Sequence, residues 1–368
     1  MARVAILGAG AGGAAAAVEL TGLGHAVSLW SRSPETLQPF QEAGGVRHEG
    51  VLGDGFTSVS RINARLEEAL EGADVALVCL PSLAHDTVAD ELLRARARLP
   101  VVLNPGHTGG ALHFAARMGE HAPPLAELST LTYVARKPAE ATVRVTAAAG
   151  RVRAACLPGG EAALRWACEL YAAARPERDV LATGLANVNL VLHPPAAVLG
   201  AAWVEATGGN FRFYADATTP AVARVMAALD SERLAVARAF GHELDPLLRE
   251  MAAIGTVDPA TAATGDLRAA IAGGDANRDI FAPDSLAHRY YAEDFGYGVL
   301  PFCVLARMAG VDVPTAEALL GLADTFMGGA VVAGGLGAER MGLAESDLDG
   351  LLARTRPRAQ AAVAGHKG

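Results

Sequence analysis

A glycine-rich turn close to the N-terminus constrains the fold of this chain more than any other feature. Its glycines Gly8, Gly10 and Gly13 stand between a short β-type run, Arg3–Leu7, and an apolar stretch over residues 14–20 that is expected to be helical. In such a strand–turn–helix unit the first glycine permits a tight turn, the second lets the backbone approach a pyrophosphate, and the third allows close packing of helix on strand. The turn therefore predicts a dinucleotide site, with a purely structural turn as the alternative in a chain that has 41 glycines.

Strand and helix signals alternate through the first hundred residues. Ala26–Trp30 is expected to be a second strand, and Ser33 and Pro34 supply an N-cap and an N1 proline for a helix after it. The runs 75–80 and Val101–Leu103 are continuously apolar, which is typical of parallel strands covered by helices on both faces. We therefore predict a Rossmann-type α/β domain with a doubly wound parallel sheet.

After about residue 180 helical signals follow one another without alternating strand runs. Residues 220–240 start with Pro220 after Thr219, carry apolar side chains at helical spacing and end before Gly241. Further helices are expected at 244–253, 297–309 and 315–327. We predict a dinucleotide-binding domain over residues 1–180 and an all-α domain over residues 181–368, with a surface loop at the glycine-rich stretch 328–337 and a frayed tail at 354–368.

The composition bounds the class of protein. A chain of 368 residues that is 51% hydrophobic can fill two cores, since one core rarely grows past roughly 250–300 residues. A net charge of -9 argues against a nucleic-acid or membrane-surface partner, and no apolar run approaches the ~20 residues of a membrane span. The four cysteines form no CxxC pair, so neither a disulfide framework nor a metal site is indicated. We expect a cytoplasmic protein.

The end of the second strand bears on the choice of cofactor. An NAD site usually carries an acid about 20 residues past the glycines, whereas this chain has Ser31 and Arg32 there. With no carboxylate to repel a 2′-phosphate, NADP(H) is expected to be preferred over NAD(H), unless Arg32 is an ordinary surface arginine. The expected cofactor contacts are Gly8, Gly10, Ala11, Gly12, Gly13, Ser31, Arg32, Leu80 and Pro81.

Two segments of the second half carry candidate catalytic groups. Asn189 and His193 lie four residues apart, on one helix face, and two prolines then end or kink that helix at a surface or cleft. A histidine there suits acid–base chemistry, although a structural histidine is the alternative. In the second segment Asp294 is expected to orient His193, and Arg289 to grip a substrate carboxylate. The sequence alone does not show that residues 193 and 294 touch.

Four segments in this order and spacing make the chain resemble the octopine/nopaline dehydrogenase family of opine dehydrogenases, and most of all its shorter bacterial members acting on aliphatic amino acids. They are residues 8–13, 104–111, 187–194 and 289–294, the last followed by Leu300 and Pro301. The resemblance implies a Rossmann domain joined to a helical domain of the 6-phosphogluconate dehydrogenase-like type, with the active site between them. It implies His193 as the acid–base group, Asp294 as its partner, Arg289 as the 2-oxo-acid ligand, Asn189 as a substrate contact, and Thr130 near nicotinamide and substrate. One departure is that relatives using NAD carry an acid where this chain has Ser31 and Arg32.

The activity that the resemblance implies is the NADPH-dependent condensation of an amino acid with a 2-oxo acid such as pyruvate, through an imine that hydride reduces. The partners are then these small molecules, and the composition allows but does not demand a homodimer. For His107, in a loop after a strand, a place in the cleft and a simple turn role both stay open.

Two other classes remain as alternatives. Ketopantoate, glycerol-phosphate and 3-hydroxyacid reductases share such a fold but depend on a lysine in the helical domain. Only two of the 31 basic residues here are lysines, Lys137 in the first domain and Lys367 beside the C-terminus, which disfavours that class. The second alternative is an NADP-binding sensor without catalysis, in which His193, Asp294 and Arg289 would be incidental.

Overall fold

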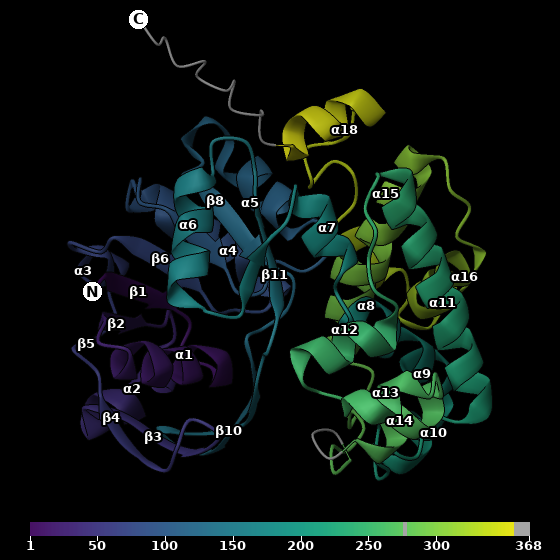
Figure 1. Ribbon diagram of the computed structural model, residues 1–368, viewed down its shortest axis with the longest axis horizontal. Coiled ribbons are helices and arrows are strands. Elements are labelled where there is room, and N and C mark those ends of the chain that lie inside the picture. Colours follow the sequence, from purple (N-terminus) through teal and green to yellow (C-terminus); the bar gives the residue numbers. More distant parts are fainter. Residues whose placement is uncertain (275–277, 357–368) are drawn as a thin grey trace, which may run out of the picture.

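The computed structural model describes residues 1–274 and 278–356 as two halves side by side (Figure 1). The half that holds the N-terminus is built on a sheet, and the other half is built from helices. The last named strand of the described residues ends at Pro176, and helices follow from Val180 onward. The predicted fold class, a Rossmann-type α/β half plus a helical half, is confirmed.

The main sheet has eight strands and is mostly parallel. From β5 across to β8 every neighbouring pair is parallel, whereas β11 runs antiparallel to β8. In spatial order the strands are β12 (Ala174–Pro176), β11 (Val152–Cys156), β8 (Leu125–Leu128), β7 (Val101–Leu103), β6 (Val75–Val78), β1 (Arg3–Leu7), β2 (Ala26–Trp30) and β5 (Arg61–Asn63). Three predicted strands are confirmed at their bounds, whereas the predicted run 75–80 stops pairing at Val78.

Helices cover both faces of this sheet. Val4 and Ile6 of β1 pack in one apolar cluster with α1, and Ala5 and Leu7 pack in another with α4 and α5. Ser33 caps α2 as predicted, accepting a hydrogen bond from the N–H of Thr36. Helix α1 begins three residues before the predicted stretch. The elements of this half are α1 (Ala11–Gly22), α2 (Pro34–Ala43), α3 (Leu66–Leu70), the 3₁₀ turn η1 (Ser82–Ala84), α4 (His85–Arg94), α5 (Gly110–Met118), the 3₁₀ turn η2 (Gly119–His121) and α6 (Glu161–Leu170).

A second, four-stranded sheet packs against α1 and was not predicted. Its strands, in spatial order, are β4 (Gly55–Ser58), β3 (Gly45–Gly50), β10 (Thr142–Ala148) and β9 (Tyr133–Ala139). The central pair, β3 and β10, is parallel and joins segments far apart in the sequence. The sheet positions β9, whose residues Arg136 and Lys137 reach the cleft described below.

The second half contains helices of very different lengths. They are α7 (Val180–Leu185), α8 (Asn189–Leu192), α9 (Pro194–Leu199), α10 (Ala201–Thr207), α11 (Pro220–Ala239), α12 (Leu247–Ile254), α13 (Pro259–Ala263), α14 (Leu267–Gly273), the π-helix η3 (Tyr290–Val299), α15 (Leu300–Ala309), α16 (Pro314–Phe326), α17 (Ala330–Gly334) and α18 (Leu348–Thr355). The first part of the predicted helix 297–309 is thus the end of a π-helix, a rare form that is often found at functional sites. Within the described ranges no single helix is long and apolar enough to cross a membrane, and only the bent pair Val180–Leu199 with Ala201–Thr207 passes that test jointly.

Two expectations about the C-terminal region need correction. The stretch 328–337 is not simply a surface loop, because it contains α17 and buries Val331 and Leu336. Gly335 has no room for a side chain, since an added Cβ would lie 2.5 Å from the Val331 carbonyl oxygen. Of the tail predicted to fray, residues up to Thr355 belong to α18, and residues 357–368, with Lys367, lie outside the described part.

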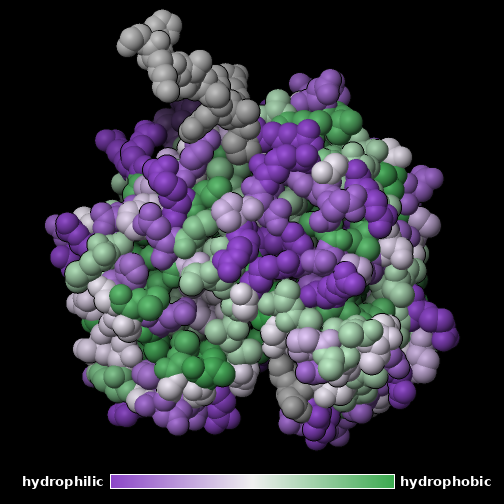
Figure 2. Space-filling view, viewed as in Figure 1, coloured by the Kyte–Doolittle hydropathy of each residue, from purple (hydrophilic) through white to green (hydrophobic). Residues whose placement is uncertain are grey.

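Buried polar contacts join the two halves. Glu127 of β8 accepts hydrogen bonds from the Thr183 hydroxyl at 2.5 Å and the Ala111 N–H at 2.9 Å, and burial raises its pKa to about 8. Arg153 of β11 forms a 2.5 Å ion pair with Glu250 of α12. On the surface, hydrophilic side chains gather along the upper part of the seam, and the lower edge is notched between the halves (Figure 2).

Candidate active site

A cleft of about 540 Å³ lies between the two halves, beyond the carboxyl ends of β1, β6 and β7. Parallel α/β sheets bind their ligands at this edge. The N-terminal half contributes the glycine turn, the loops after β6 and β7, and strand β9, and the helical half contributes α8 and the start of η3. The residues that carry polar or charged groups into the cleft are Asn104, His107, Ser129, Thr130, Arg136, Lys137, Asn187, Asn189, His288, Arg289, Tyr290 and Glu293.

A second pocket of about 310 Å³ adjoins the cleft, and the two share Leu80, Pro81 and Arg289. Its other walls come from Gly8, the end of β2 and the start of α4. Arg32 lines it and donates a 3.4 Å hydrogen bond to the Thr87 hydroxyl. No carboxylate is among the described residues that line this pocket.

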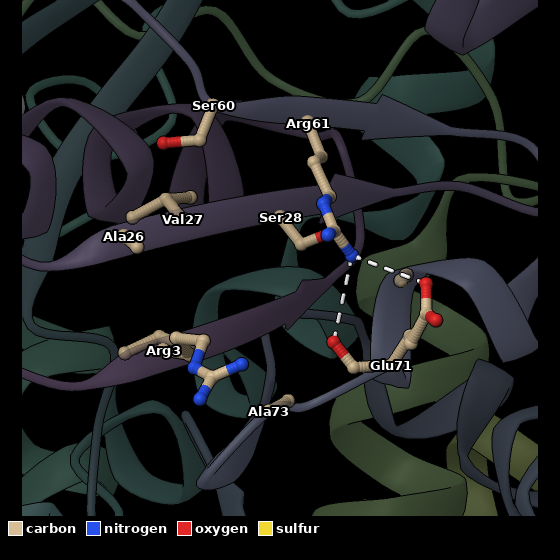
Figure 3. Close-up of a pocket in the computed structure, with 10 residues that line it drawn as sticks. Arg3, Ala26, Val27, Ser28, Ser60, Arg61, Glu71 and Ala73 are labelled. Carbon is tan, nitrogen blue, oxygen red and sulfur yellow. Dashed lines mark hydrogen bonds and ion pairs between the residues drawn. The ribbon is translucent and has the colours of Figure 1, made fainter.

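A third, smaller cavity of about 140 Å³ lies at the opposite edge of the sheet (Figure 3). Arg3 and Ala26, the first residues of β1 and β2, line it, and Arg61 forms a 3.5 Å ion pair with Glu71 there. Because it opens at the amino ends of the strands, it stands apart from the glycine turn. It is not part of the candidate site.

The glycine turn has the geometry that its sequence predicted. Gly8 has a φ of +124°, and a Cβ on Gly13 would lie 1.7 Å from the Gly8 carbonyl oxygen, so the third glycine permits the contact of helix with strand. Gly10 is the N-cap of α1, and a Cβ there would meet nothing within 4 Å. The space in front of Gly10 and the free N–H groups of α1 fit a pyrophosphate. Of the expected cofactor residues, all except Gly13 line the cleft or the adjoining pocket.

His193 and Asp294 are in contact, which the sequence could not show. The imidazole Nδ1 lies 2.8 Å from Asp294 Oδ2, across 101 residues of sequence. His193 sits between α8 and α9, and Asp294 sits in η3, against which both helices pack. The carboxylate sets the tautomer, since an Nδ1–H that donates to it leaves Nε2 with its lone pair.

The environment of His193 differs from the expectation in one respect. Its side chain is only 7% exposed and is not among the residues that line the cleft, although Asn189 is. Tyr290 separates the imidazole from the cleft: the two rings stack with centroids 4.4 Å apart and an interplanar angle of 20°. The Tyr214 hydroxyl lies 2.8 Å from Nε2. The helix therefore ends behind the cleft wall rather than at an open surface.

Arg289 and Glu293 lie at the mouth of the site. The side chain of Arg289 is 56% exposed, and its guanidinium lies 3.6 Å from the Glu293 carboxylate. Glu293 is buried, accepts a 2.8 Å hydrogen bond from the Ser82 N–H, and lies 3.6 Å from His107 Nε2. It thus ties η3 to the loops after β6 and β7. His107, for which the sequence left two roles open, lines the cleft in a left-handed conformation with φ at +61°.

Tyr214, Tyr290 and Glu293 lie at or behind the cleft wall, and no role was predicted for them. Tyr290 and Glu293 belong to the charged and aromatic segment 289–294, so their proximity to Asp294 was a usable signal. Tyr214 lies in a turn segment between α10 and α11. This position carries no local pattern that points to the cleft.

Comparison with known proteins identifies the family. A family model for the α-helical domain of NAD/NADP octopine/nopaline dehydrogenase matches residues 176–327, and one for coenzyme F420-dependent NADP oxidoreductases matches residues 3–103. The opine dehydrogenase of Arthrobacter sp. (strain 1C) is 31% identical over 332 residues, which is 88% of this chain and 90% of that protein. The chain belongs to the opine dehydrogenase family. It is an NAD(P)-dependent oxidoreductase of the kind that acts on CH–NH groups of amino acids.

Solved structures share this opine dehydrogenase fold. Octopine dehydrogenase with NADH and L-arginine aligns with a TM-score of 0.76 at 20% identity, covering 96% of this chain and 98% of that one. Yersinopine dehydrogenase with NADP⁺ aligns with a TM-score of 0.70 at 17% identity, covering 93% and 97%. At these identities the alignments show the fold alone.

Membership of the opine dehydrogenase family disfavours both alternatives from the sequence, the lysine-dependent reductases and the sensor. Lys137 does line the cleft, but from β9 of the first half, with its ammonium 4.6 Å from the centroid of the Phe40 ring. It is therefore not the helical-domain lysine that those reductases use.

Proposed function

We propose that this protein catalyses the NADPH-dependent reductive condensation of an amino acid with a 2-oxo acid, through an imine, to a secondary amine. The observation that carries the proposal is the His193–Asp294 pair, 2.8 Å apart behind the wall of a cleft that begins at the glycine turn. Gly8, Gly10, Ala11 and Gly12 would hold the pyrophosphate, and Leu80 and Pro81 would contact the nicotinamide half. A nicotinamide bound there supplies the hydride that reduces the imine carbon.

Other residues at the cleft bind the substrates or take part in proton transfer. Arg289 holds the carboxylate of the 2-oxo acid, and Thr130 and Asn189 contact the substrates from the two sides of the cleft. His193 supplies the proton that lets the hydroxyl of the carbinolamine leave as water, and Asp294 stabilises the imidazolium that holds this proton beforehand. Holding both reactants in one orientation can supply several kcal/mol of the barrier.

The charges of the cleft restrict which amino acids can serve as the amine donor. Arg136, Lys137 and Arg289 bring positive charge, and Glu293 is the one carboxylate among the described lining residues. Glu293 is already engaged by the Ser82 N–H and Arg289. A guanidinium or ammonium on the donor side chain would find no free partner, and an unpaired charge is costly to desolvate. We therefore propose amino acids with neutral side chains as donors.

The test of the activity is a matrix of amino acids and 2-oxo acids, followed by NADPH absorbance at 340 nm and by mass spectrometry of the product. We expect a secondary amine with pyruvate and neutral amino acids, and at least tenfold lower kcat/KM with arginine. Tight NADPH binding without turnover for any pair would instead favour the sensor.

A first prediction concerns the cofactor. The pocket around Ser31 and Arg32 has no described carboxylate, so we expect kcat/KM to favour NADPH over NADH by at least roughly tenfold. Ser31→Asp should reverse this preference, because a carboxylate beside the 2′-phosphate repels it at a cost of several kcal/mol. Steady-state kinetics with both cofactors measures this, with Ser60→Asp as the control on a turn at the opposite edge of the sheet. A tenfold preference of the wild type for NADH would contradict the proposal.

A second prediction concerns Arg289. Replacement by lysine should raise KM for the 2-oxo acid by roughly tenfold, because an ammonium cannot reproduce two parallel hydrogen bonds to a carboxylate. Arg144→Lys is the matched control, since Arg144 is equally exposed at 55% and is also paired with a glutamate, Glu49. Because Arg289 borders both pockets, KM for NADPH must be measured as well. A rise in that KM alone would place Arg289 on the cofactor instead.

A further inference from the structure

The imidazole of His193 does not border the cleft directly. Both ring nitrogens are occupied, Nδ1 by Asp294 and Nε2 by the Tyr214 hydroxyl, each at 2.8 Å. The side chain is nearly buried and does not line the cleft. A proton held on this imidazole therefore needs a path to the substrates.

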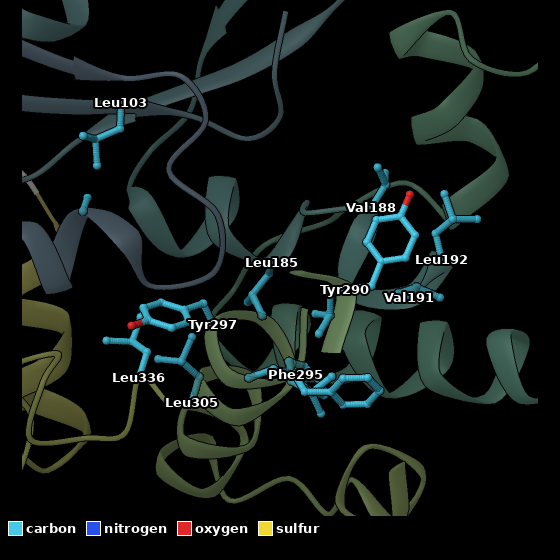
Figure 4. Packing of buried hydrophobic residues seen from close by; sticks show 14 of the residues in the cluster. Leu103, Leu185, Val188, Val191, Leu192, Tyr290, Phe295, Tyr297, Leu305 and Leu336 are labelled. Atoms are coloured by element: carbon cyan, nitrogen blue, oxygen red, sulfur yellow. The ribbon is translucent and has the colours of Figure 1, made fainter. Parts of the chain in front are cut away.

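Tyr290 stands on that path. It lines the cleft on one side and stacks on the imidazole on the other. Its ring lies beside Val188 and Leu192, so apolar side chains hold it in place (Figure 4). As the first residue of η3, it is positioned by the same helix as Asp294.

Tyr214 connects Tyr290 to the imidazole. Its ring lies 5.9 Å from that of His193, its hydroxyl lies 2.8 Å from Nε2, and its phenol interacts with the phenol of Tyr290. The contact between the two phenols raises the pKa of Tyr214 and lowers that of Tyr290. Two phenol hydroxyls thus stand between the cleft and Nε2.

Both tyrosines are in the protonation state that such a path needs. Burial raises the pKa of each phenol above its ordinary value, so each carries its O–H at neutral pH. A phenol with its proton donates one hydrogen bond and accepts another, and can therefore pass a proton on.

The charged groups around the two phenols differ between the cleft end and the imidazole end of the path. Arg136 from β9 lowers the pKa of both tyrosines, and Arg289 lowers that of Tyr290, while Asp294 raises both. The ring of His288 makes an edge contact with Tyr290, with centroids 4.7 Å apart. The two guanidiniums stabilise a phenolate formed for a moment at the cleft end, and Asp294 stabilises the proton at the imidazole end.

We propose that Tyr290 and Tyr214 form a proton relay between the substrate cleft and His193, a proposal that rests on the proposed function. In the direction of synthesis the hydroxyl of the carbinolamine takes a proton from the Tyr290 phenol. The C–O bond breaks, water leaves with its electron pair, and the nitrogen lone pair forms the C=N bond. Tyr290 regains its proton from Tyr214, and Tyr214 from the Nε2–H of the imidazolium, which leaves a neutral imidazole bonded to Asp294.

In this scheme Tyr290 is a catalytic residue and Tyr214 a relay residue that acts through it. Tyr290→Phe and Tyr214→Phe keep the rings but remove the hydroxyls. We expect each to lower kcat for amine formation by at least roughly tenfold, with KM for NADPH within about twofold of the wild type. The solvent deuterium isotope effect on kcat should rise, and the pH profile of kcat should change, because protons no longer pass between the imidazole and the cleft.

The matched control is Tyr291→Phe. Tyr291 is the next residue along η3 and is also buried, but its hydroxyl donates to the Ala197 carbonyl oxygen at 3.3 Å, away from the relay. It should keep the kcat, isotope effect and pH profile of the wild type. If Tyr214→Phe does not fold, difluorotyrosine at position 214 keeps the hydroxyl with a lower pKa and should shift the pH profile of kcat.

The outcomes separate the relay from the activity on which it rests. A wild-type enzyme that forms a secondary amine, with both phenylalanine variants matching it in kcat, isotope effect and pH profile, would overturn the relay and leave the activity standing. A wild type that forms no such product with any substrate pair would overturn both. Loss of kcat with the isotope and pH changes, in the two variants but not in Tyr291→Phe, supports the relay.

Discussion

Replacement of His193 by alanine is expected to lower kcat by roughly 10²–10⁴-fold while the affinity for NADPH stays unchanged. The imidazole is the buried end of the proton path, held by Asp294 and Tyr214 at 2.8 Å each, and an alanine methyl group can neither store nor return a proton. The cofactor pocket is lined by other residues, so the binding of NADPH should not change. Stopped-flow turnover and titration of NADPH fluorescence measure the two quantities separately.

His242→Ala is the matched control for this experiment. His242 is as buried as His193, with 6% of its side chain exposed, and its Nε2 lies 2.8 Å from a buried carboxylate, Asp179. Both substitutions leave a buried carboxylate without its histidine, so both should lower the unfolding temperature. Only His193→Ala should lower kcat per folded molecule. Equal kcat values for the two variants would contradict the assignment of His193.

The second large effect is expected from Gly13→Ala. A Cβ at this position would lie 1.7 Å from the Gly8 carbonyl oxygen. The backbone of Gly8 is itself held in place, because its N–H donates to the Trp30 carbonyl oxygen at 2.9 Å. It is also closely packed, since a Cβ added there would lie 2.6 Å from the Cys79 carbonyl oxygen, and its φ is +124°. Helix α1 must therefore move, and with it the N–H groups that cradle the pyrophosphate. A misplacement of about 1 Å can cost about 10²-fold, so we expect the Kd for NADPH to rise roughly 100-fold.

Gly22→Ala, at the other end of α1, is the control for Gly13→Ala. An added Cβ there meets nothing within 4 Å. Replacing a helical glycine by alanine stabilises by about 0.5–1 kcal/mol, so the unfolding temperature should rise slightly and NADPH binding should not change. Calorimetry of unfolding and of binding reports both. Unaltered NADPH binding by Gly13→Ala would show that the contact of helix with strand does not position the cofactor site.

Much of the N-terminal half followed from short-range patterns. The glycine turn, the Ser33 cap and the strands Arg3–Leu7 and Ala26–Trp30 depend on consecutive residues, whose conformational preferences act within a few positions. The sheet of β9, β10, β3 and β4 was missed for the opposite reason. Its central pair joins Thr142–Ala148 to Gly45–Gly50, and its strands are partly exposed and polar, so no continuous apolar run marks them.

The candidate site also combines residues that local sequence patterns indicated with residues that such patterns did not indicate. His193, Asp294 and Arg289 were proposed because prolines, charges and aromatic residues cluster around them in the sequence and because of the resemblance to the family. Tyr214 was not, because it lies in a turn segment whose importance comes from a contact with a residue on another element. The stretch 328–337 was misjudged because its glycines suggested a loop, whereas packing against η3 buries Val331 and Leu336.

By itself the sequence indicated the class of chemistry, through a dinucleotide turn, the absence of an acid after the second strand, a candidate acid–base histidine before two prolines, and too few lysines for the rival reductases. Only the tertiary structure decided how these groups are connected. The packing of α8 and α9 on η3 brings His193 to Asp294 across 101 residues, and it also buries the imidazole behind Tyr290. Such contacts depend on the packing of whole helices, since side-chain distances between elements are not encoded in the spacing of residues along the chain.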